Sequence, residues 1–354
     1  MKRTRVVVLF GGRSVEREVS RISARTICGA LDASRYDVVP IALDPNGRFL
    51  PAVDSARLLA SGAVPEKFRR GGDSSSEALV PVEIAPGRAD VVFPIVHGTT
   101  GEDGTLQGFL ETLGIPYVGA GVAASAVGMD KAIFKTLLRE AGIPTPRSVV
   151  VRAAEPALEE APFTAPLFVK PACGGSSVGV TKVKRPEELR PALELAFRYD
   201  ERALIEEAID ARELECAVLG DEQPRASVPG EVVPGHEFYD YDDKYRDDKA
   251  KLLIPAPVSE AVAAETRRLA VEVFRLCNVS GMARVDFFLE RRTDRVLVNE
   301  INTLPGFTAI SMYPKLWEAS GLPLPRLLDE LIRLALERSE RRGRLLTKPP
   351  AELT

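Results

Sequence analysis

Short apolar runs alternate with helical patterns over the first third of the chain. The run at 5–10 (RVVVLF) ends at the glycine pair 11–12, and apolar residues then recur at helical spacing over 15–30. Further extended runs follow at 37–43, 90–96 and 115–119. This alternation predicts a parallel sheet with helices on its faces, so we expect an N-terminal α/β domain over 1–122. Within it, 61–88 is rich in Gly, Pro, Ser and charge, which predicts a surface insertion.

The pattern changes in the middle of the chain. Apolar residues over 125–141 follow one helical face that ends at Gly142 and Pro144, the usual order at a helix C-terminus. Extended runs follow at 147–151, 166–170, 178–183 and 203–206, with a helical pattern at 187–198. We expect a mainly antiparallel sheet with helices on one side, forming a central α+β domain over 123–211.

A second α+β domain is predicted over 212–345. It is expected to contain a helix at 260–277, strands at 282–290 and 295–302, and a final amphipathic helix at 325–338. The tail 346–354 is expected to fray.

Composition and charge favour a globular protein with a small partner. The 354 residues exceed what one core usually fills, which agrees with several domains. The 47 basic and 51 acidic residues are spread along the chain, which argues against a nucleic-acid or anionic-membrane binder. No apolar run is long enough to span a bilayer, and the four cysteines form no CxxC pair. We therefore expect a cytoplasmic protein with reduced thiols.

The stretches MARVDFFLE and RVLVNEIN carry the most specific chemistry. Strand alternation places Asp286 on one face of the first stretch, and Glu300 and Asn302 on one face of the second. If 291–295 forms a five-residue hairpin connection, Asp286 lies opposite Glu300. Oxygen ligands without His or Cys suit Mg²⁺. The alternative is that these side chains only face solvent, but three on one face between apolar residues favour a metal site.

The stretch PLFVKPACGGSSVGVTKV is similar to a phosphate-binding hairpin. Lys170 ends a strand before a loop whose glycines let backbone N–H groups approach phosphate oxygens, and Ser176 and Ser177 add donors. The loop is not a Walker loop, because the GxxxxGK[ST] order is missing and no helix follows. Taken alone, it also fits a flexible hairpin turn.

Acidic residues lie at two strand ends in LIEEAIDARELECAVLG. Glu206 and Glu207 end one strand, and Glu213 begins the next. Such an edge could hold adenine through backbone groups and a ribose through a carboxylate. Acids at strand ends are common, so this stretch alone also fits a structural role.

Together these motifs resemble the ATP-grasp superfamily, whose members clamp ATP between two α+β subdomains. Three further stretches narrow the resemblance to the D-alanine–D-alanine ligases: LFGGRSVEREVS at 9–20, HGTTGEDGTLQG at 97–108 and EFYDYDDKY at 237–245. The resemblance implies an ATP-grasp fold. It also implies ATP-dependent joining of two D-alanines through an acyl phosphate, with release of ADP and phosphate, for peptidoglycan precursors.

The resemblance also implies roles around the amino-acid substrates. Glu16 matches the acid that holds the ammonium of the first D-alanine, and Ser176 and Tyr245 match its hydrogen-bond partners. Arg284 and the backbone N–H of Gly306 match the donors to the oxyanion of the tetrahedral intermediate. The positions matched near the substrates are His97 at the first D-alanine and Lys244, Ser311 and Met312 at the second. For His97, a turn or core residue is the alternative.

The nucleotide and metal residues are implied in the same way. Lys131 and Lys170 match lysines that contact ATP phosphates. The adenine hinge is matched by Glu206, Glu207 and Ile209, and Glu213 matches the acid on the ribose hydroxyls. Asp286, Glu300 and Asn302 match the ligands of two Mg²⁺ ions, with Mn²⁺ as an alternative. The stretch 236–250 is the candidate lid, and the family implies a homodimer.

Three other interpretations fit parts of the sequence. A ligase of the same fold that uses D-lactate or D-serine as second substrate is less favoured, because Tyr245 in YDYDDKY matches the pattern of the D-alanine enzymes. A nicotinamide oxidoreductase is disfavoured because G-x-G-x-x-G is absent. A non-catalytic nucleotide-binding regulator would be expected to lose Arg284, Glu16 or a metal ligand, and all are present.

Overall fold

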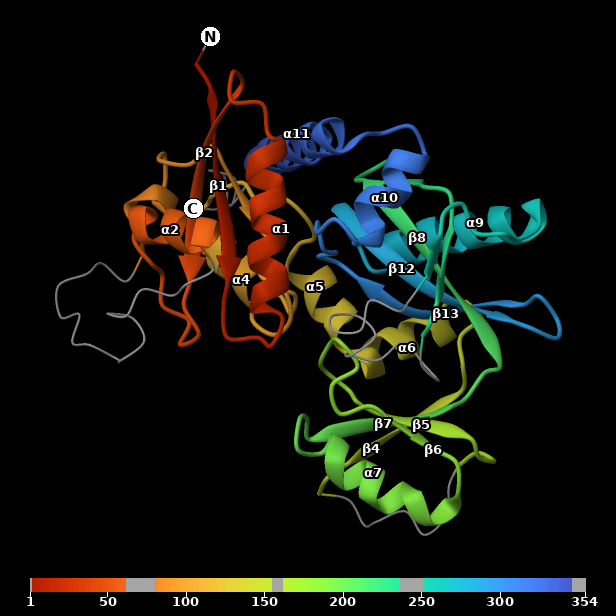
Figure 1. The fold of residues 1–354 in the computed structure, drawn as a ribbon. Coiled ribbons are helices and arrows are strands. Elements are labelled where there is room, and N and C mark those ends of the chain that lie inside the picture. Colours follow the sequence, from red (N-terminus) through yellow and green to blue (C-terminus); the bar gives the residue numbers. More distant parts are fainter. Residues whose placement is uncertain (1, 62–79, 155–161, 236–250, 346–354) are drawn as a thin grey trace, which may run out of the picture.

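The structure, a computed structural model, describes residues 2–61, 80–154, 162–235 and 251–345, and these form three lobes, each built on its own sheet (Figure 1). No helix in these ranges is long and apolar enough to cross a membrane. The α/β and α+β fold class expected from the sequence is confirmed.

The N-terminal lobe is built on three parallel strands in the order β2-β1-β3. The strands are β1 (Thr4–Gly11), β2 (Tyr36–Leu43) and β3 (Val91–Pro94), with helices α1 (Arg17–Ala30), α2 (Ala52–Ser61) and α4 (Thr105–Thr112) and the 3₁₀ turn η1 (Val82–Ile84). The extended run at 115–119 makes only a single bridge, between Val92 and Tyr117. Pro116 has no N–H to donate, and Gly119 adopts a φ of +96°, so a regular strand does not continue there.

The central lobe is an antiparallel sheet in the order β4-β7-β5-β6, with helix α7 packed on one face. Its elements are β4 (Ser148–Arg152), β5 (Leu167–Pro171), β6 (Thr181–Val183), η2 (Pro186–Glu188), α7 (Leu189–Ala196) and β7 (Arg202–Glu207). The predicted strands and helix of this domain are present, each within a few residues of the expected bounds.

The prediction of a single helix over 125–141 is wrong in one respect, because the structure has two helices there. Helix α5 (Val122–Met129) ends before Asp130, and α6 (Lys131–Glu140) begins directly after it. The Asp130 side chain accepts hydrogen bonds from the backbone N–H groups of Ala132 and Ile133, both at 3.0 Å. Apolar spacing continues across the break, but this N-cap starts a new helix and places Lys131 in its first turn.

The C-terminal lobe contains an antiparallel sheet in the order β11-β10-β8-β12-β13, with β9 paired to β8. Its strands are β8 (Ala211–Gly220), β9 (Arg225–Ala226), β10 (Gly230–Val233), β11 (Lys251–Leu253), β12 (Gly281–Glu290) and β13 (Val296–Asn302). Helix α9 (Glu260–Leu276) packs on β8, β12 and β13. The predicted helix and the two predicted strands of this domain are therefore present.

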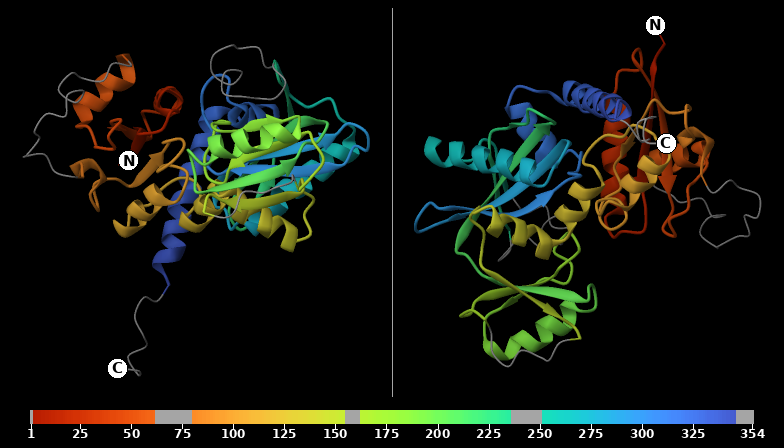
Figure 2. Two further views of the ribbon diagram at one scale, coloured as in Figure 1. Left: turned by 90° about the horizontal axis from the view of Figure 1, so that it is seen from below. Right: turned by 180° about the vertical axis from the view of Figure 1, so that it is seen from behind.

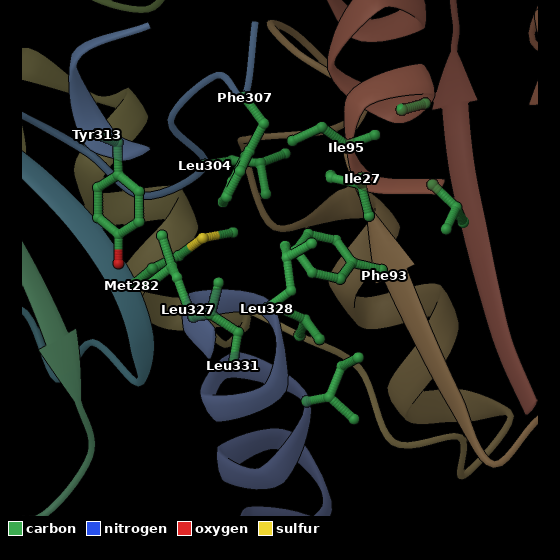
Figure 3. Packing of buried hydrophobic residues seen from close by; sticks show 14 of the residues in the cluster. Ile27, Phe93, Ile95, Met282, Leu304, Phe307, Tyr313, Leu327, Leu328 and Leu331 are labelled. Carbon is green, nitrogen blue, oxygen red and sulfur yellow. The ribbon is translucent and has the colours of Figure 1, made fainter. Parts of the chain in front are cut away.

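The largest core joins the two ends of the chain. Helix α11 (Leu324–Gly343) packs between the C-terminal sheet and the N-terminal lobe, and α10 (Met312–Ala319) packs on β8 and α11 (Figures 1 and 2). Phe307, Leu328 and Phe93 share one buried cluster there (Figure 3). Because this core mixes residues from both ends, the boundaries at 122 and 211 stay a prediction.

Candidate active site

Two cavities meet where the three lobes come together. The first cavity lies between the central sheet and strands β8, β10, β12 and β13, and encloses about 380 Å³. The second cavity lies between α1, the residues after β3 and the loop 303–311, and encloses about 630 Å³. Both are lined by the same wall, which consists of Lys131, Gly174, Gly175, Ser176, Glu215, Arg284 and Glu300. A group that enters from either cavity reaches this shared wall.

The candidate residues gather in these two cavities. Those that line the first are Lys131, Lys170, Ser176, Ser177, Glu206, Glu207, Ile209, Glu213, Arg284, Asp286 and Glu300. Those that line only the second are Glu16, His97, Asn302, Gly306, Ser311 and Met312. Lys244 and Tyr245, with the candidate lid 236–250, lie outside the described residues.

Glu206 is held by two lysines at the floor of the first cavity. Its Oε1 lies 2.6 Å from Lys170 Nζ and its Oε2 lies 2.7 Å from Lys135 Nζ, and its side chain is 1% exposed. Burial alone would raise the pKa of Glu206, but the two ammonium groups outweigh it and lower the pKa to about 2. Glu206 therefore carries its charge at neutral pH, and Lys170 is fixed in place.

Lys135 was missed by the sequence analysis. It lies one turn after Lys131 in α6 and also donates to Thr145 Oγ1 at 2.9 Å. Burial lowers its pKa. The stretch KAIFK carries the signal that could have identified it. Its second lysine lies on the helix side that otherwise packs Phe134 and Leu138, and a lysine is rarely buried without a partner. The Glu207 carboxylate pairs with Arg147 at 2.8 Å rather than with these lysines.

The glycine-serine loop is shaped for close approach of its backbone. Ser176 and Ser177 adopt φ angles of +53° and +58°, which non-glycine residues rarely do. Consecutive residues of this kind turn their N–H groups toward one side. Ser176 Oγ also donates to Glu16 Oε1 at 2.5 Å, so the loop of the central lobe meets the N-terminal lobe at this point. Lys131 Nζ donates to the Gly174 carbonyl at 2.6 Å on the other side.

Strands β12 and β13 place Asp286 opposite Glu300, as expected, and Arg284 opposite Asn302. The pairing at the hairpin end differs from the expectation. A five-residue connection over 291–295 would pair Glu290 with Val296, but Val296 pairs with Leu289. A bulge at Asn299 restores the Asp286–Glu300 pair.

Arg284 is enclosed by carboxylates. Its Nε and Nη2 donate to the two oxygens of Asp286 at 2.6 and 2.7 Å, and Nε lies 3.0 Å from Glu215 Oε2. Burial disfavours the charged guanidinium, but the carboxylates raise the pKa of Arg284 well above its usual range. Glu215, in β8, was missed by the sequence analysis because nothing in ELECAVLG marks it.

The metal candidates provide oxygen donors only. Among the described residues, no three His, Cys, Asp or Glu side chains form a group that could hold a metal ion. Asp286, Glu300 and the amide of Asn302 instead lie on adjacent strands at the two cavities. Two carboxylates and an amide oxygen fit Mg²⁺, which keeps several waters and binds substrate phosphates.

His97 lies in the second cavity, although it is buried like a core residue. Its Nδ1 lies 3.2 Å from Glu102 Oε1, and its Nε2 lies 3.4 Å from Ser23 Oγ. Burial lowers the pKa of His97, but Glu102, together with smaller effects of Glu16 and the Leu304 backbone, makes the net shift upward. Neither Glu102 nor Ser23 was identified from the sequence. Glu102 lies in the stretch 97–108 that carried the family resemblance, whereas Ser23 lies just beyond the stretch 9–20.

The loop after β13 forms the opposite wall of the second cavity. A Cβ on Gly306 would lie 2.8 Å from Ser311 Oγ, so only glycine fits there without a shift. Ser311 Oγ accepts from the Thr308 backbone N–H at 2.9 Å. This loop therefore keeps the Gly306 backbone close to the Ser311 hydroxyl.

Comparison with known proteins shows the family. Residues 5–120 match the family model described as D-ala D-ala ligase N-terminus, and residues 137–333 match D-ala D-ala ligase C-terminus. A D-alanine–D-alanine ligase from Thermoanaerobacter sp. (strain X514) is 46% identical, and the alignment covers 95% of this chain and 98% of the relative.

Solved structures agree with this match. The D-alanine-D-alanine ligase from Coxiella burnetii is 40% identical with a TM-score of 0.82, and covers 97% of each chain. The VanG D-Ala:D-Ser ligase from Enterococcus faecalis is 33% identical with a TM-score of 0.80, over 94% of this chain and 100% of that chain. These likenesses confirm the ATP-grasp fold. The chain therefore belongs to the D-alanine–D-alanine ligase family, whose members join two D-alanines in an ATP-dependent reaction.

Proposed function

We propose that the first cavity binds ATP, that the second binds two D-alanines, and that the reaction runs at the wall they share. The single observation that carries this proposal is the shared wall itself. Lys131, Arg284 and Glu300 line both cavities, so a phosphoryl group in one can meet a carboxylate in the other. In-line transfer needs such a meeting point.

The first D-alanine would be oriented by Glu16, with its ammonium on the carboxylate that Ser176 also contacts. Its carboxylate then attacks the γ-phosphorus of ATP, the bond to the bridging oxygen breaks, and ADP leaves. Lys131 and Lys170 supply positive charge beside the phosphates while negative charge shifts from the γ-phosphoryl group to ADP. The product of the step is an acyl phosphate, and phosphate becomes the leaving group of the next step.

The neutral amine of the second D-alanine then attacks the acyl carbon. Arg284 and the Gly306 N–H would stabilise the oxyanion that forms, since donors aimed at developing charge are the largest contributors in acyl transfer. Collapse expels phosphate, and the amine loses its proton to give the dipeptide. Lys244, Ser311 and Met312 are the proposed contacts of the second D-alanine, with Tyr245 beside Glu16 and Ser176.

For the nucleotide, we assign adenine to the hinge Glu206, Glu207 and Ile209, and the ribose to Glu213, with Ser177 on a phosphate. Asp286, Glu300 and Asn302 would hold two Mg²⁺ ions, or Mn²⁺. When bound, these ions would neutralise charge on the transferring phosphoryl group.

The other finer assignments rest on the family alone. A homodimer in the cytoplasm that supplies the dipeptide for peptidoglycan is the arrangement we propose. The second substrate is proposed to be D-alanine, with D-lactate or D-serine as the alternative. The likeness to a D-Ala:D-Ser ligase at 33% identity makes D-serine a necessary comparison.

Phosphate release by the purified protein with Mg-ATP tests this function. D-Alanine should give phosphate and D-alanyl-D-alanine, identified by mass, whereas L-alanine should give neither. Parallel reactions that add D-serine or D-lactate to D-alanine would give a mixed product if the alternative holds. No D-alanine-dependent phosphate would refute the substrate assignment.

A further inference from the structure

A buried serine of α1 contacts the loop that carries Gly306. Ser23 is 0% exposed and does not line either cavity. Its Oγ accepts a hydrogen bond from the Phe307 backbone N–H at 3.0 Å, across 284 positions of the sequence. Ser23 therefore ties the N-terminal lobe to the residue that follows Gly306.

The side chain of Phe307 is held separately. Its ring packs edge-on against Phe93, with centroids 5.9 Å apart and an angle of 89°, and lies 5.8 Å from the Tyr313 ring (Figure 3). Leu304 lies in the same buried cluster. Packing of this kind fixes where the loop lies but does not fix how its peptide groups point.

The hydrogen bond to Ser23 supplies that orientation. The Phe307 N–H and the Gly306 carbonyl belong to one planar peptide unit, so holding this N–H restricts the ψ angle of Gly306. Glycine has no Cβ and would otherwise sample a wide range of backbone angles. The Gly306 N–H belongs to the preceding peptide unit, so the Ser23 hydroxyl affects its direction by limiting how that unit can turn about the Gly306 Cα.

We propose that Ser23 is a positioning residue for the second half of the reaction, acting through the Gly306 backbone. This inference rests on the proposed function, in which the Gly306 N–H meets the oxyanion. Ser23 does not touch the reacting atoms. His97, whose Nε2 lies 3.4 Å from Ser23 Oγ, connects the same hydroxyl to the floor of the second cavity.

The consequence is specific to one step. Without Ser23, the acyl phosphate still forms, because Glu16, Lys131 and the first cavity are unchanged. Amine attack slows, since its oxyanion is held less well. Water attack at phosphorus forms no such oxyanion, so hydrolysis can compete. The bond from phosphorus to the acyl oxygen then breaks, and phosphate leaves with the first D-alanine regenerated.

The test compares Ser23→Ala with Ser20→Ala. Ser20 is equally buried in α1, and its hydroxyl bonds to the backbones of Gly11 and Ile95 rather than to the loop. We expect Ser23→Ala to lower kcat for dipeptide roughly tenfold, the size expected for one lost hydrogen bond. Phosphate released per dipeptide should rise above one, with KM for ATP unchanged. Ser20→Ala should keep the ratio at one.

Two further variants guard against a folding artefact. Ser23→Thr keeps the hydroxyl and should restore coupling, whereas Ser23→Cys, of similar shape but a weak acceptor, should not. Coupled turnover in Ser23→Ala or Ser23→Cys, with phosphate and dipeptide equal as in wild type, would overturn the proposal. A wild-type protein that makes no dipeptide would instead refute the proposed function, so the two failures are distinguishable.

Discussion

Lys135 and Glu206 form a buried ion pair under the first cavity, with 2.7 Å between Nζ and Oε2 and side-chain exposures of 3% and 1%. Lys170 contacts the other carboxylate oxygen. A charge pair this deep is costly to break from one side, because the remaining partner stays buried. The pair therefore links the stability of the protein to the position of a proposed phosphate-binding lysine.

Lys135→Met should make the folded protein less stable at acidic pH. The pKa of Glu206 is lowered from 4.5 to about 2, so its contribution is present above pH 4.5 and is lost as the pH falls toward 2. This shift corresponds to roughly 3 kcal/mol. With one cation removed, the pKa of Glu206 should rise, so acid destabilisation should begin at higher pH. Thermal unfolding followed from pH 2 to 7 measures this.

Arg139→Met is the matched control for that experiment. Arg139 is exposed on the same helix and does not contact Glu206. Its variant should follow the wild-type pH curve. An unchanged pH profile in Lys135→Met would contradict the assignment of the low pKa to this lysine.

Glu16 and Ser176 should act as a unit in substrate binding. Their oxygens are 2.5 Å apart, and the contact joins two lobes. Glu16→Gln removes the charge proposed to hold the ammonium of the first D-alanine, so its KM should rise about tenfold to a hundredfold. In a double-mutant cycle with Ser176→Ala, the two effects should be less than additive. Strict additivity of the two KM changes would argue against a shared role.

Arg284→Lys should lower kcat by about a hundredfold or more. A lysine cannot reproduce the two parallel hydrogen bonds to Asp286 while also reaching Glu215 and the oxyanion. Arg295→Lys is a suitable control, because Arg295 lies on the same hairpin and is largely exposed. ATP affinity measured by calorimetry separates a loss of chemistry from a loss of binding. Equal kcat values in the two variants would refute the role of Arg284.

Removal of divalent metal should abolish phosphate release, and Mg²⁺ or Mn²⁺ should restore it. Asn302→Ala should raise the Mg²⁺ concentration needed for half-maximal activity, because it removes one of three proposed oxygen ligands. Asn302 Oδ1 also accepts from the Leu304 N–H at 2.9 Å, so some loss of stability is expected. A Mg²⁺ dependence identical to wild type would show that Asn302 is not a ligand.

Local spacing predicted the parts of the site that lie on strands. Asp286, Glu300 and Asn302 share a hairpin, and alternation was enough to place them together. It could not reveal the bulge at Asn299, because a bulge depends on pairing with the other strand. Glu215 and Ser23 act through partners distant in the sequence, and no local pattern marks such contacts. Spacing alone does not suggest the roles proposed for Glu16 at the substrate ammonium and for Arg284 at the oxyanion. Those roles come from the resemblance to a known family.

The break at Asp130 offers a final prediction that separates two roles of one side chain. Asp130 caps α6 and also pairs with Arg202, with 2.6 Å between Oδ2 and Nη2. Asp130→Ala removes both interactions, and loss of the cap alone should cost about 1 kcal/mol. Asp130→Ser keeps a capping oxygen but loses the ion pair. If the cap sets the position of Lys131, Asp130→Ala should raise the KM for ATP and Asp130→Ser should not. Equal KM values in both variants, each higher than wild type, would instead assign the effect to Arg202.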